Sequence, residues 1–270
     1  SLLEDYPEYQ ASCCSIITRD VIPRFPGHDP ELILKLNTPF DWPPKAAKKE
    51  KKEKIGILMV HGMYGSPFSM RDLGQYFQHH GLHARSITLP GHCSLPKHLT
   101  RIDLEDFQLT VKKAVETFSK EVDTIYLLGF SFGGSLILDY YHHLADNKMI
   151  AGLIPLAPAL KLRSRLAWTL PCLEKLKFYK YYEHGKEVDH TRYLNLATHS
   201  GHQVYRIIKK LQKCPRLITD KLFLATASDD EVVTPKTIKS LFDSSHTKSK
   251  KLLVYRPGKN EENDNIIFRN

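Results

Sequence analysis

One serine lies in a five-residue pattern that suits a nucleophile. An apolar, β-rich run at 124–128 is followed by Gly129-Phe130-Ser131-Phe132-Gly133, and a helical pattern begins directly afterwards, at 135–144. A sharp strand-to-helix turn needs small residues two places before and after the serine, because its strained backbone packs closely against its neighbours. Such a turn raises the hydroxyl above the end of a sheet, where a general base can reach it. The pattern predicts Ser131 as a catalytic nucleophile.

A second turn could supply the hydrogen-bond donors that this chemistry needs. When a serine attacks an acyl carbon, a tetrahedral oxyanion forms, and preorganised N–H groups must stabilise it. The apolar run at 55–60 is followed by His61-Gly62-Met63-Tyr64-Gly65 and then by a helical pattern. We expect the backbone amides of Met63 and Phe132 to form the oxyanion hole. His61 and Gly62 shape the turn in this arrangement, and His61 is not the base.

Strand and helix signals alternate along most of the chain. Apolar or alternating runs predict strands at 31–37, 55–60, 82–89, 124–128, 149–156, 221–227 and 251–255. Helical patterns lie at 67–80, 104–120, 135–144 and 235–242, and a turn is expected at 41–44. Alternation of this kind implies right-handed crossovers and a mostly parallel sheet with helices on both faces. The predicted fold class is therefore α/β.

One segment interrupts this alternation. Residues 159–219 carry no strand signal and are rich in helix formers, so we expect an inserted helical subdomain there, with residues 1–158 and 220–270 forming the core. The segment has 13 Lys and Arg against 4 Asp and Glu, which accounts for the whole formal net charge of +9. Aromatic residues accompany these charges, and the combination favours contact with an anionic membrane surface. A solvated helical face is the alternative. No nucleic-acid-binding motif accompanies the charge.

Composition limits the remaining possibilities. The sequence has five cysteines without metal-type spacing, which favours reduced thiols. No apolar stretch approaches the length of a membrane span, and a cytoplasmic or peripheral membrane location is favoured. No phosphate loop, dinucleotide fingerprint or metal-ligand spacing is present, so we expect neither a cofactor nor a metal.

The order of the motifs resembles the α/β-hydrolase family. The similarity extends over about residues 31–256 and is strongest in three motifs: His61-Gly62-Met63-Tyr64-Gly65-Ser66-Pro67, Leu89-Pro90-Gly91-His92, and Gly129-Phe130-Ser131-Phe132-Gly133-Gly134. These motifs are similar to those of the bacterial carboxylesterase and monoacylglycerol lipase branch. The resemblance implies a helical cap after the sixth strand, an acyl-enzyme on Ser131, and an acyl-glycerol or lysophospholipid-like ester as substrate. An acyl thioesterase is an open alternative, and so is a peptidase of the same fold.

The resemblance also indicates the acid. The segment Ser228-Asp229-Asp230-Glu231-Val232-Val233 follows the strand at 221–227, and Asp230 matches the family's spacing of an Asp, one residue and two apolar ones. A carboxylate here would hold the base histidine in its useful tautomer and stabilise its protonated form. Asp229 is the neighbouring alternative. The alternative is that these two aspartates have only a structural role, as the N-cap of a helix that begins near Pro235.

A base is missing from the expected place. A triad in the order Ser, Asp, His requires a histidine just past the last strand, but residues 255–261 contain none. After Asp230 the only histidine is His246, which precedes the strand at 251–255 and would lie across the sheet from Ser131. We therefore expect the base beyond Asn270. The alternative is a non-catalytic, lipid-binding module on a hydrolase scaffold.

Overall fold

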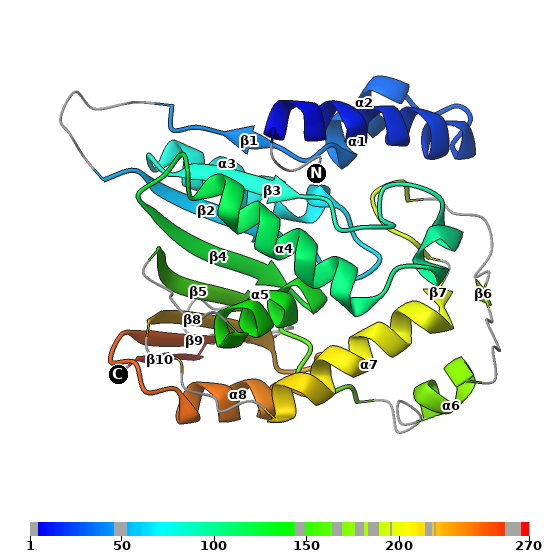
Figure 1. Ribbon diagram of the computed structural model, residues 1–270. Coiled ribbons are helices and arrows are strands. Elements are labelled where there is room, and N and C mark those ends of the chain that lie inside the picture. The colour runs from blue at the N-terminus through cyan, green and yellow to red at the C-terminus, as the bar shows by residue number, and fades with distance from the viewer. Residues whose placement is uncertain are drawn as a thin grey trace.

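An eight-stranded sheet forms the centre of the computed structural model (Figure 1). The structure describes residues 5–45, 53–143, 149–163, 169–175, 181–182, 189–194, 196–213, 218, 220–256 and 266–269. The strands of the sheet are β1 (Asp41–Trp42), β2 (Ile55–Val60), β3 (His83–Ile87), β4 (Thr124–Phe130), β5 (Ile150–Leu156), β8 (Lys221–Ala227), β9 (Lys250–Tyr255) and β10 (Ile266–Arg269). Their spatial order is β1-β3-β2-β4-β5-β8-β9-β10, and only the two outermost pairings are antiparallel. The predicted α/β class and mostly parallel sheet are confirmed.

Helices cover both faces of this sheet. The helices of one face are α4 (Leu104–Phe118), α5 (Phe132–His143), α7 (Thr198–Lys213) and α8 (Pro235–Ser244), whereas η3 (Pro67–Met70) and α3 (Arg71–His79) pack on the other. Side chains alternate along β2 accordingly. Leu58 and Val60 join the cluster under α4 and α5, and Ile57 and Met59 join the cluster under α3. Because β2 is buried on both faces, its sequence is almost entirely apolar.

The predicted strand at 31–37 is wrong, because this segment is the helix α2 (Pro30–Asn37). Asp29 caps the helix by accepting a hydrogen bond from the Glu31 amide, and Pro30 occupies its first turn, where proline is well tolerated. Ile33 and Asn37 are buried one helical turn apart. The alternating pattern of the sequence therefore concealed a helical period. The predicted turn at 41–44 also differs, since β1 begins at Asp41.

The N-terminal residues form a helix for which the sequence analysis gave no role. Helix α1 (Tyr6–Asp20) begins at the cap Asp5 and is joined to α2 through η2 (Ile22–Arg24). The Tyr6 hydroxyl donates to the carbonyls of Phe40 and Ser86 at 2.9 Å and 2.6 Å. Tyr9 contacts Thr88 in the same way, through its hydroxyl. Two tyrosines thus fasten α1 to the sheet beside β3.

The segment between β5 and β8 contains α6 (Leu170–Lys175), β6 (Tyr181–Tyr182), β7 (Leu196–Ala197) and α7. The pair β6–β7 is a small antiparallel sheet, so the expectation of a strand-free insertion was incomplete. In the eight-stranded sheet, the segment follows β5, which is the fifth strand in chain order, rather than a sixth strand as expected. Ile207, Ile208 and Leu211 of α7 are buried in the main core cluster, which makes the end of the segment continuous with the core. The division at 159–219 stays a prediction.

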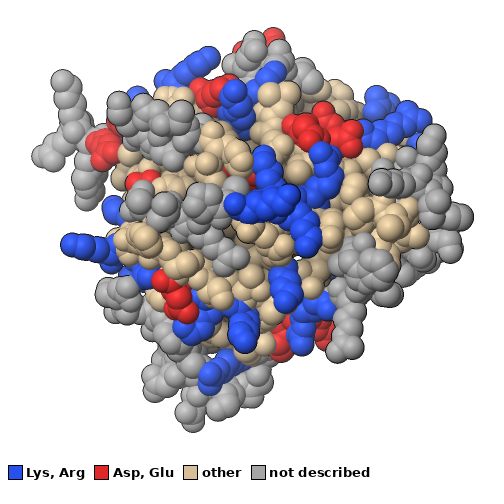
Figure 2. Space-filling view, turned by 60° about the horizontal axis from the view of Figure 1, so that its bottom comes forward, with Lys and Arg blue, Asp and Glu red and all other residues tan. Residues whose placement is uncertain are grey.

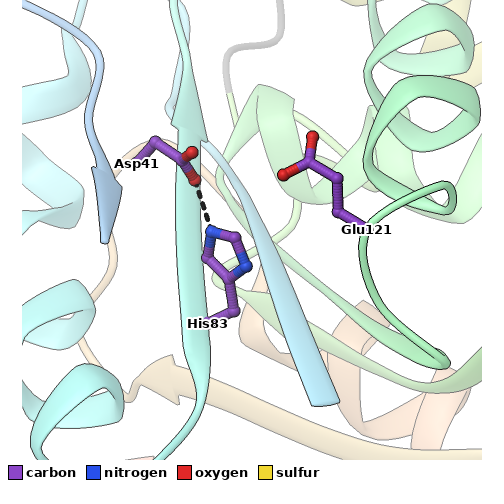
Figure 3. Close-up of side chains that lie close together, drawn as sticks. All are labelled: Asp41, His83 and Glu121. Atoms are coloured by element: carbon purple, nitrogen blue, oxygen red, sulfur yellow. Dashed lines mark hydrogen bonds and ion pairs between the residues drawn. The ribbon is translucent and has the colours of Figure 1, made fainter. Parts of the chain in front are cut away.

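The buried side chain of Arg85, on β3, joins this strand to β1 and to the segment just after α4. Figure 3 shows Asp41 and His83, which share a hydrogen bond of 2.6 Å, with Glu121 nearby. These three side chains could offer ligand atoms to a metal ion. However, the Arg85 guanidinium, which is 2% exposed, already binds both Asp41 and Glu121 through paired hydrogen bonds. It also lies between the rings of Tyr6 and Phe118. Arg85 therefore supplies the positive charge that these carboxylates require.

We predict that Arg85→Met lowers the free energy of unfolding by about 3 kcal/mol or more, because removing one partner of a buried ion pair leaves the other uncompensated. Burial raises the pKa of Asp41, but hydrogen bonds from His83 and Arg85 outweigh it, so its net pKa is lowered. Urea unfolding monitored by circular dichroism measures the change. The control is Arg101→Met at an exposed site, which should stay within about 0.5 kcal/mol of wild type. Equal stability of the two variants would contradict this role of Arg85.

Candidate active site

Ser131 occupies a strained turn between β4 and α5. Its φ of 51° lies in the left-handed region that side chains other than glycine rarely adopt. The backbone is fixed there, because the Ser131 amide donates to the Leu156 carbonyl at 2.8 Å and its carbonyl accepts from the amides of Ser135 and Ala159. The residue is partly exposed, and its hydroxyl has no hydrogen-bond partner among the described residues. Ser131 is thus held in position with a free, accessible hydroxyl.

Two glycines allow this turn to sit against the sheet. A Cβ at Gly133 would lie 2.3 Å from the carbonyl oxygen of Val60, and one at Gly129 would lie 2.4 Å from the carbonyl oxygen of Gly133. Both distances are shorter than real contacts, so neither position tolerates a side chain without movement of backbone. The spacing of glycines around Ser131 is therefore a packing requirement.

The turn after β2 approaches the serine directly. A Cβ at Gly62 would lie 3.3 Å from the Cβ of Ser131. Within the part of the chain that the structure describes, no acceptor is bonded to the backbone amides of Met63 and Phe132. The Tyr64 amide, by contrast, donates to His92 Nε2 at 3.0 Å. Of the two adjacent amides in this turn, only that of Met63 is available as a donor.

His61 is fixed by hydrogen bonds at both ring nitrogens. The Leu89 amide donates to Nε2 at 3.0 Å, which places the ring proton on Nδ1, where it is donated to the Gly62 carbonyl at 2.8 Å. The ring is completely buried. Burial, aided by the neighbouring His92, lowers the pKa of His61 to about 3. A neutral imidazole with both nitrogens engaged cannot accept the serine proton, and its hydrogen bonds join the turn after β2 to the loop after β3.

His92 acts in the same way from the following loop. Its Nδ1 donates to the Pro90 carbonyl at 3.0 Å, while its Nε2 accepts the Tyr64 amide. Burial lowers its pKa to about 4. Tyr64 has a φ of 66°, and this hydrogen bond holds it in that strained conformation. The Leu-Pro-Gly-His motif thus positions the turn after β2, a contact that the sequence pattern alone does not disclose.

Backbone strain is concentrated at one edge of the sheet. The described residues other than glycine with positive φ are Tyr64, Cys93, Ser131 and Ala157. They follow the carboxyl ends of β2, β3, β4 and β5. Strained positions of this kind cluster at functional sites in folded proteins. This edge, rather than any other part of the described chain, is the candidate active site.

Asp230 lies beyond the carboxyl end of β8, at the same edge. Its Oδ1 accepts from the amides of Val232 and Val233 at 2.9 Å and 2.8 Å, and its Oδ2 has no partner among the described residues. Asp229 is exposed. The N-cap of α8 is Thr234, so neither aspartate caps that helix. The geometry favours Asp230 over its neighbour as the acid.

The start of the inserted segment is paired with the loop that carries Asp230. Leu162 forms an antiparallel bridge with Val233, and the Arg163 amide donates to the Val232 carbonyl at 3.0 Å. The Arg163 guanidinium also donates to the Asp230 carbonyl at 2.6 Å. Sequence reasoning missed this pairing, because nothing in residues 161–163 marks them as a strand. The insertion therefore helps to hold the acid loop in place.

No described histidine is hydrogen-bonded to the Ser131 hydroxyl. His61 and His92 are fully engaged, and His246 is an exposed residue that precedes β9. Since β9 runs parallel to β4 within the sheet, its amino end lies at the opposite edge from Ser131. His246 therefore lies away from Ser131. The expected position of the base beyond Asn270 stays a prediction.

We predict that acidification destabilises this site. The folded protein holds His92 at a pKa of about 4, below its ordinary value of 6.5, so the unfolded chain binds more protons as the pH falls below about 6.5. This difference in proton binding lowers the free energy of unfolding by on the order of 2 kcal/mol at about pH 5, because one pKa unit corresponds to about 1.4 kcal/mol. His92→Gln should reduce the slope of unfolding free energy against pH, measured by urea denaturation.

His246→Gln is the matched control, because this exposed histidine lies at the opposite edge of the sheet. It should retain the wild-type slope between pH 7 and 5. An unchanged slope in His92→Gln would show that protonation of His92 does not oppose folding.

Comparison with known proteins agrees with this geometry. The model of the serine aminopeptidase (S33) family matches residues 51–259. A thermostable monoacylglycerol lipase from Bacillus sp. (strain H-257) is 30% identical over 108 residues, which are 40% of this chain and 42% of that protein. The alignment thus spans less than half of that relative.

Solved structures of lipolytic enzymes share the fold. The structure described for the metagenome-derived enzymes LipS and LipT has a TM-score of 0.68 at 20% identity, covering 82% of this chain and 87% of that chain. Monoacylglycerol lipase from Paleococcus ferrophilus has a TM-score of 0.66 at 17% identity, covering 81% and 88%. With the strained serine turn, the turn after β2 that approaches it and the family match together, the chain belongs to the serine aminopeptidase (S33) family of α/β-hydrolases.

Proposed function

We propose that this protein is a serine hydrolase of carboxylic esters that forms an acyl-enzyme on Ser131. The observation that carries the proposal is the pairing of an accessible serine hydroxyl with two unbonded backbone amides, those of Met63 and Phe132. Donors fixed in advance around a developing oxyanion are commonly the largest contribution to acyl-transfer catalysis. The strain at Ser131 and the glycine contacts keep these groups in place without a ligand.

In this mechanism, Ser131 Oγ attacks the ester carbonyl carbon and loses its proton to a base. The carbonyl oxygen becomes an oxyanion that accepts hydrogen bonds from the Met63 and Phe132 amides. Collapse of the intermediate releases the alcohol and leaves an acyl group on Ser131, which water then removes. Asp230 would orient the base through its unpaired Oδ2. The base itself has no assigned residue.

The relatives support a lipid ester as substrate. One is a monoacylglycerol lipase, and a solved structure of similar fold is a monoglyceride lipase from Saccharomyces cerevisiae in complex with a substrate analogue, with a TM-score of 0.63 at 17% identity. Phe130 and Val232, beside Ser131 and Asp230, are exposed apolar side chains at the same edge. Such side chains suit an acyl chain. We therefore propose a monoacylglycerol or lysophospholipid-like ester.

A second candidate is a lipid-binding module without turnover. It is favoured by one observation, namely that no described histidine is hydrogen-bonded to the Ser131 hydroxyl. Both candidates predict binding of acyl ligands, but only the hydrolase predicts release of an alcohol.

We predict that Ser131→Ala reduces hydrolysis of p-nitrophenyl butyrate by at least about 10³-fold, because the nucleophile is lost. Asp230→Asn should reduce it by on the order of 10³- to 10⁴-fold, because the base is then poorly oriented. Release of p-nitrophenolate measures both rates. Ser240→Ala, at an exposed position on α8, and Asp229→Asn are the matched controls and should retain wild-type rates.

Ester hydrolysis that survives Ser131→Ala would exclude the proposed mechanism. Absence of turnover in the wild-type protein, together with measurable affinity for a non-hydrolysable acyl ether, would establish the binding module instead. Loss of activity in Asp229→Asn but not in Asp230→Asn would reassign the acid.

We also propose that the basic insertion contacts an anionic membrane surface peripherally. Part of this segment lies outside the described residues, and no described helix is long and apolar enough to cross a membrane. On α7, Arg206 pairs with Glu105 and Lys210 with Asp139, whereas Lys209 and Lys213 are exposed. Figure 2 shows basic side chains lying across the middle of one face of the molecule, with some acidic ones beside them.

The double variant Lys209→Glu/Lys213→Glu should bind anionic liposomes about 30-fold more weakly or worse, because each basic residue near such a surface contributes about 1 kcal/mol. Co-sedimentation with vesicles of phosphatidylglycerol and phosphatidylcholine measures this binding at low salt. Lys236→Glu/Lys239→Glu on α8 is the control for net charge. Equal binding by both double variants and the wild type would remove the membrane proposal.

A further inference from the structure

The N-terminal segment lies outside the family match, which begins at residue 51, yet it forms one wall of a cavity. This cavity has a volume of about 730 Å³ and lies between α1, the loop at 88–94, η4 (Pro96–Thr100) and α4. Small-molecule sites typically have volumes of about 300–1,000 Å³. Figure 1 shows α1 and α4 on either side of the loop that follows β3. None of the predicted catalytic residues lines the cavity.

The walls of this cavity are held in place without a ligand. The Tyr9 hydroxyl donates to the Thr88 carbonyl at 3.0 Å and accepts from the Thr88 amide at 2.7 Å. Tyr9 and Cys13 are buried one helical turn apart and face the loop. Because two hydrogen bonds hold the Tyr9 side chain to the Thr88 backbone, the cavity is formed without a ligand, as ligand sites usually are.

Apolar side chains and two unpaired cations share the lining. Ile16, Ile102 and Leu109 contribute hydrocarbon surface, and Leu109 is 50% exposed although it is large and apolar. Arg101 and Lys113 make no ion pair with any described residue. Of the other charged side chains in the lining, Arg19 pairs with Asp20, and the Asp106 carboxylate accepts the Asp103 amide at the start of α4. Two cations, Arg101 and Lys113, thus stand against one carboxylate, that of Asp106, which no cation pairs among the described residues.

We propose that this cavity binds a long-chain carboxylate, with the alkyl chain against Ile16, Ile102 and Leu109 and the carboxylate beside Arg101 and Lys113. An apolar surface bounded by uncompensated cations matches a ligand with one hydrocarbon chain and one negative charge. Arginine suits a carboxylate in particular, because its planar donors form paired hydrogen bonds with two oxygens. The proposal is independent of the role of Ser131.

The site also touches the machinery of the candidate active site. The His92 imidazole lines the cavity and, on its other side, accepts the Tyr64 amide of the oxyanion turn. A bound chain would therefore lie against the residue that fixes this turn.

Isothermal titration calorimetry with laurate tests the proposal on the full chain, after Ser131 has been blocked with a small alkyl phosphonate or replaced by alanine. Leu109→Glu should weaken laurate binding at least tenfold, because it places a negative charge on the apolar surface. Arg101→Glu/Lys113→Glu should do the same by reversing the charges. Leu32→Glu, at a similarly exposed leucine on α2, and Lys236→Glu are the matched controls and should bind as the wild type does.

The wild-type protein should bind laurate more tightly than dodecanol, which has the chain without the charge. Laurate binding that is equal in Leu109→Glu, the Arg101/Lys113 variant and the wild type would overturn the site. Equal affinity for dodecanol would overturn the role assigned to the two cations. Circular dichroism of each exposed-site variant confirms that a loss of binding does not reflect loss of fold.

Discussion

The close approach of two turns at the carboxyl edge of the sheet is the constraint on which the candidate site depends. Gly133 lies so near the end of β2 that a Cβ there would contact the Val60 carbonyl, and Gly62 lies against Ser131. Parallel pairing of β2 with β4 brings these turns together, since their carboxyl ends meet at the same edge. A larger residue at any of these glycines would push the turn after β2 and the serine turn apart.

Hydrogen bonds from surrounding loops maintain this approach at the cost of backbone strain. His61 and His92 are buried, neutral and bonded at both nitrogens, so they act as rigid spacers between the loops after β2 and β3. The loop after β8 is held differently, through its pairing with residues 161–163. A change in the inserted segment can therefore reach Asp230 through the backbone, without crossing the core.

Much of the sheet could be predicted from sequence because its strands have strong local signals. The run Ile55–Val60 is almost entirely apolar, as expected for a buried strand. The glycines around Ser131 predict a tight strand-to-helix turn, because the packing there leaves no room for larger side chains. Residues 31–37 were mistaken for a strand, since a short amphipathic helix with a proline start can show alternation. The cap Asp29 and Pro30 were the signals that could have corrected this prediction.

Other features could not be read from sequence because they depend on contacts between distant segments. The bond from Tyr64 to His92 joins two loops, and the ladder at Leu162 and Val233 joins two segments with no strand pattern. The cavity beside α1 likewise depends on how Tyr9 meets Thr88. Local patterns specify elements and turns, whereas these pairings arise only when the elements pack.

A crystal structure of the protein with a phosphonate attached to Ser131 Oγ would test the central claim most directly. The account predicts that the phosphonyl oxygen lies about 2.7–3.1 Å from the amide nitrogens of both Met63 and Phe132. A phosphonyl oxygen directed away from these two amides, or attachment of the probe to a different residue, would contradict the account.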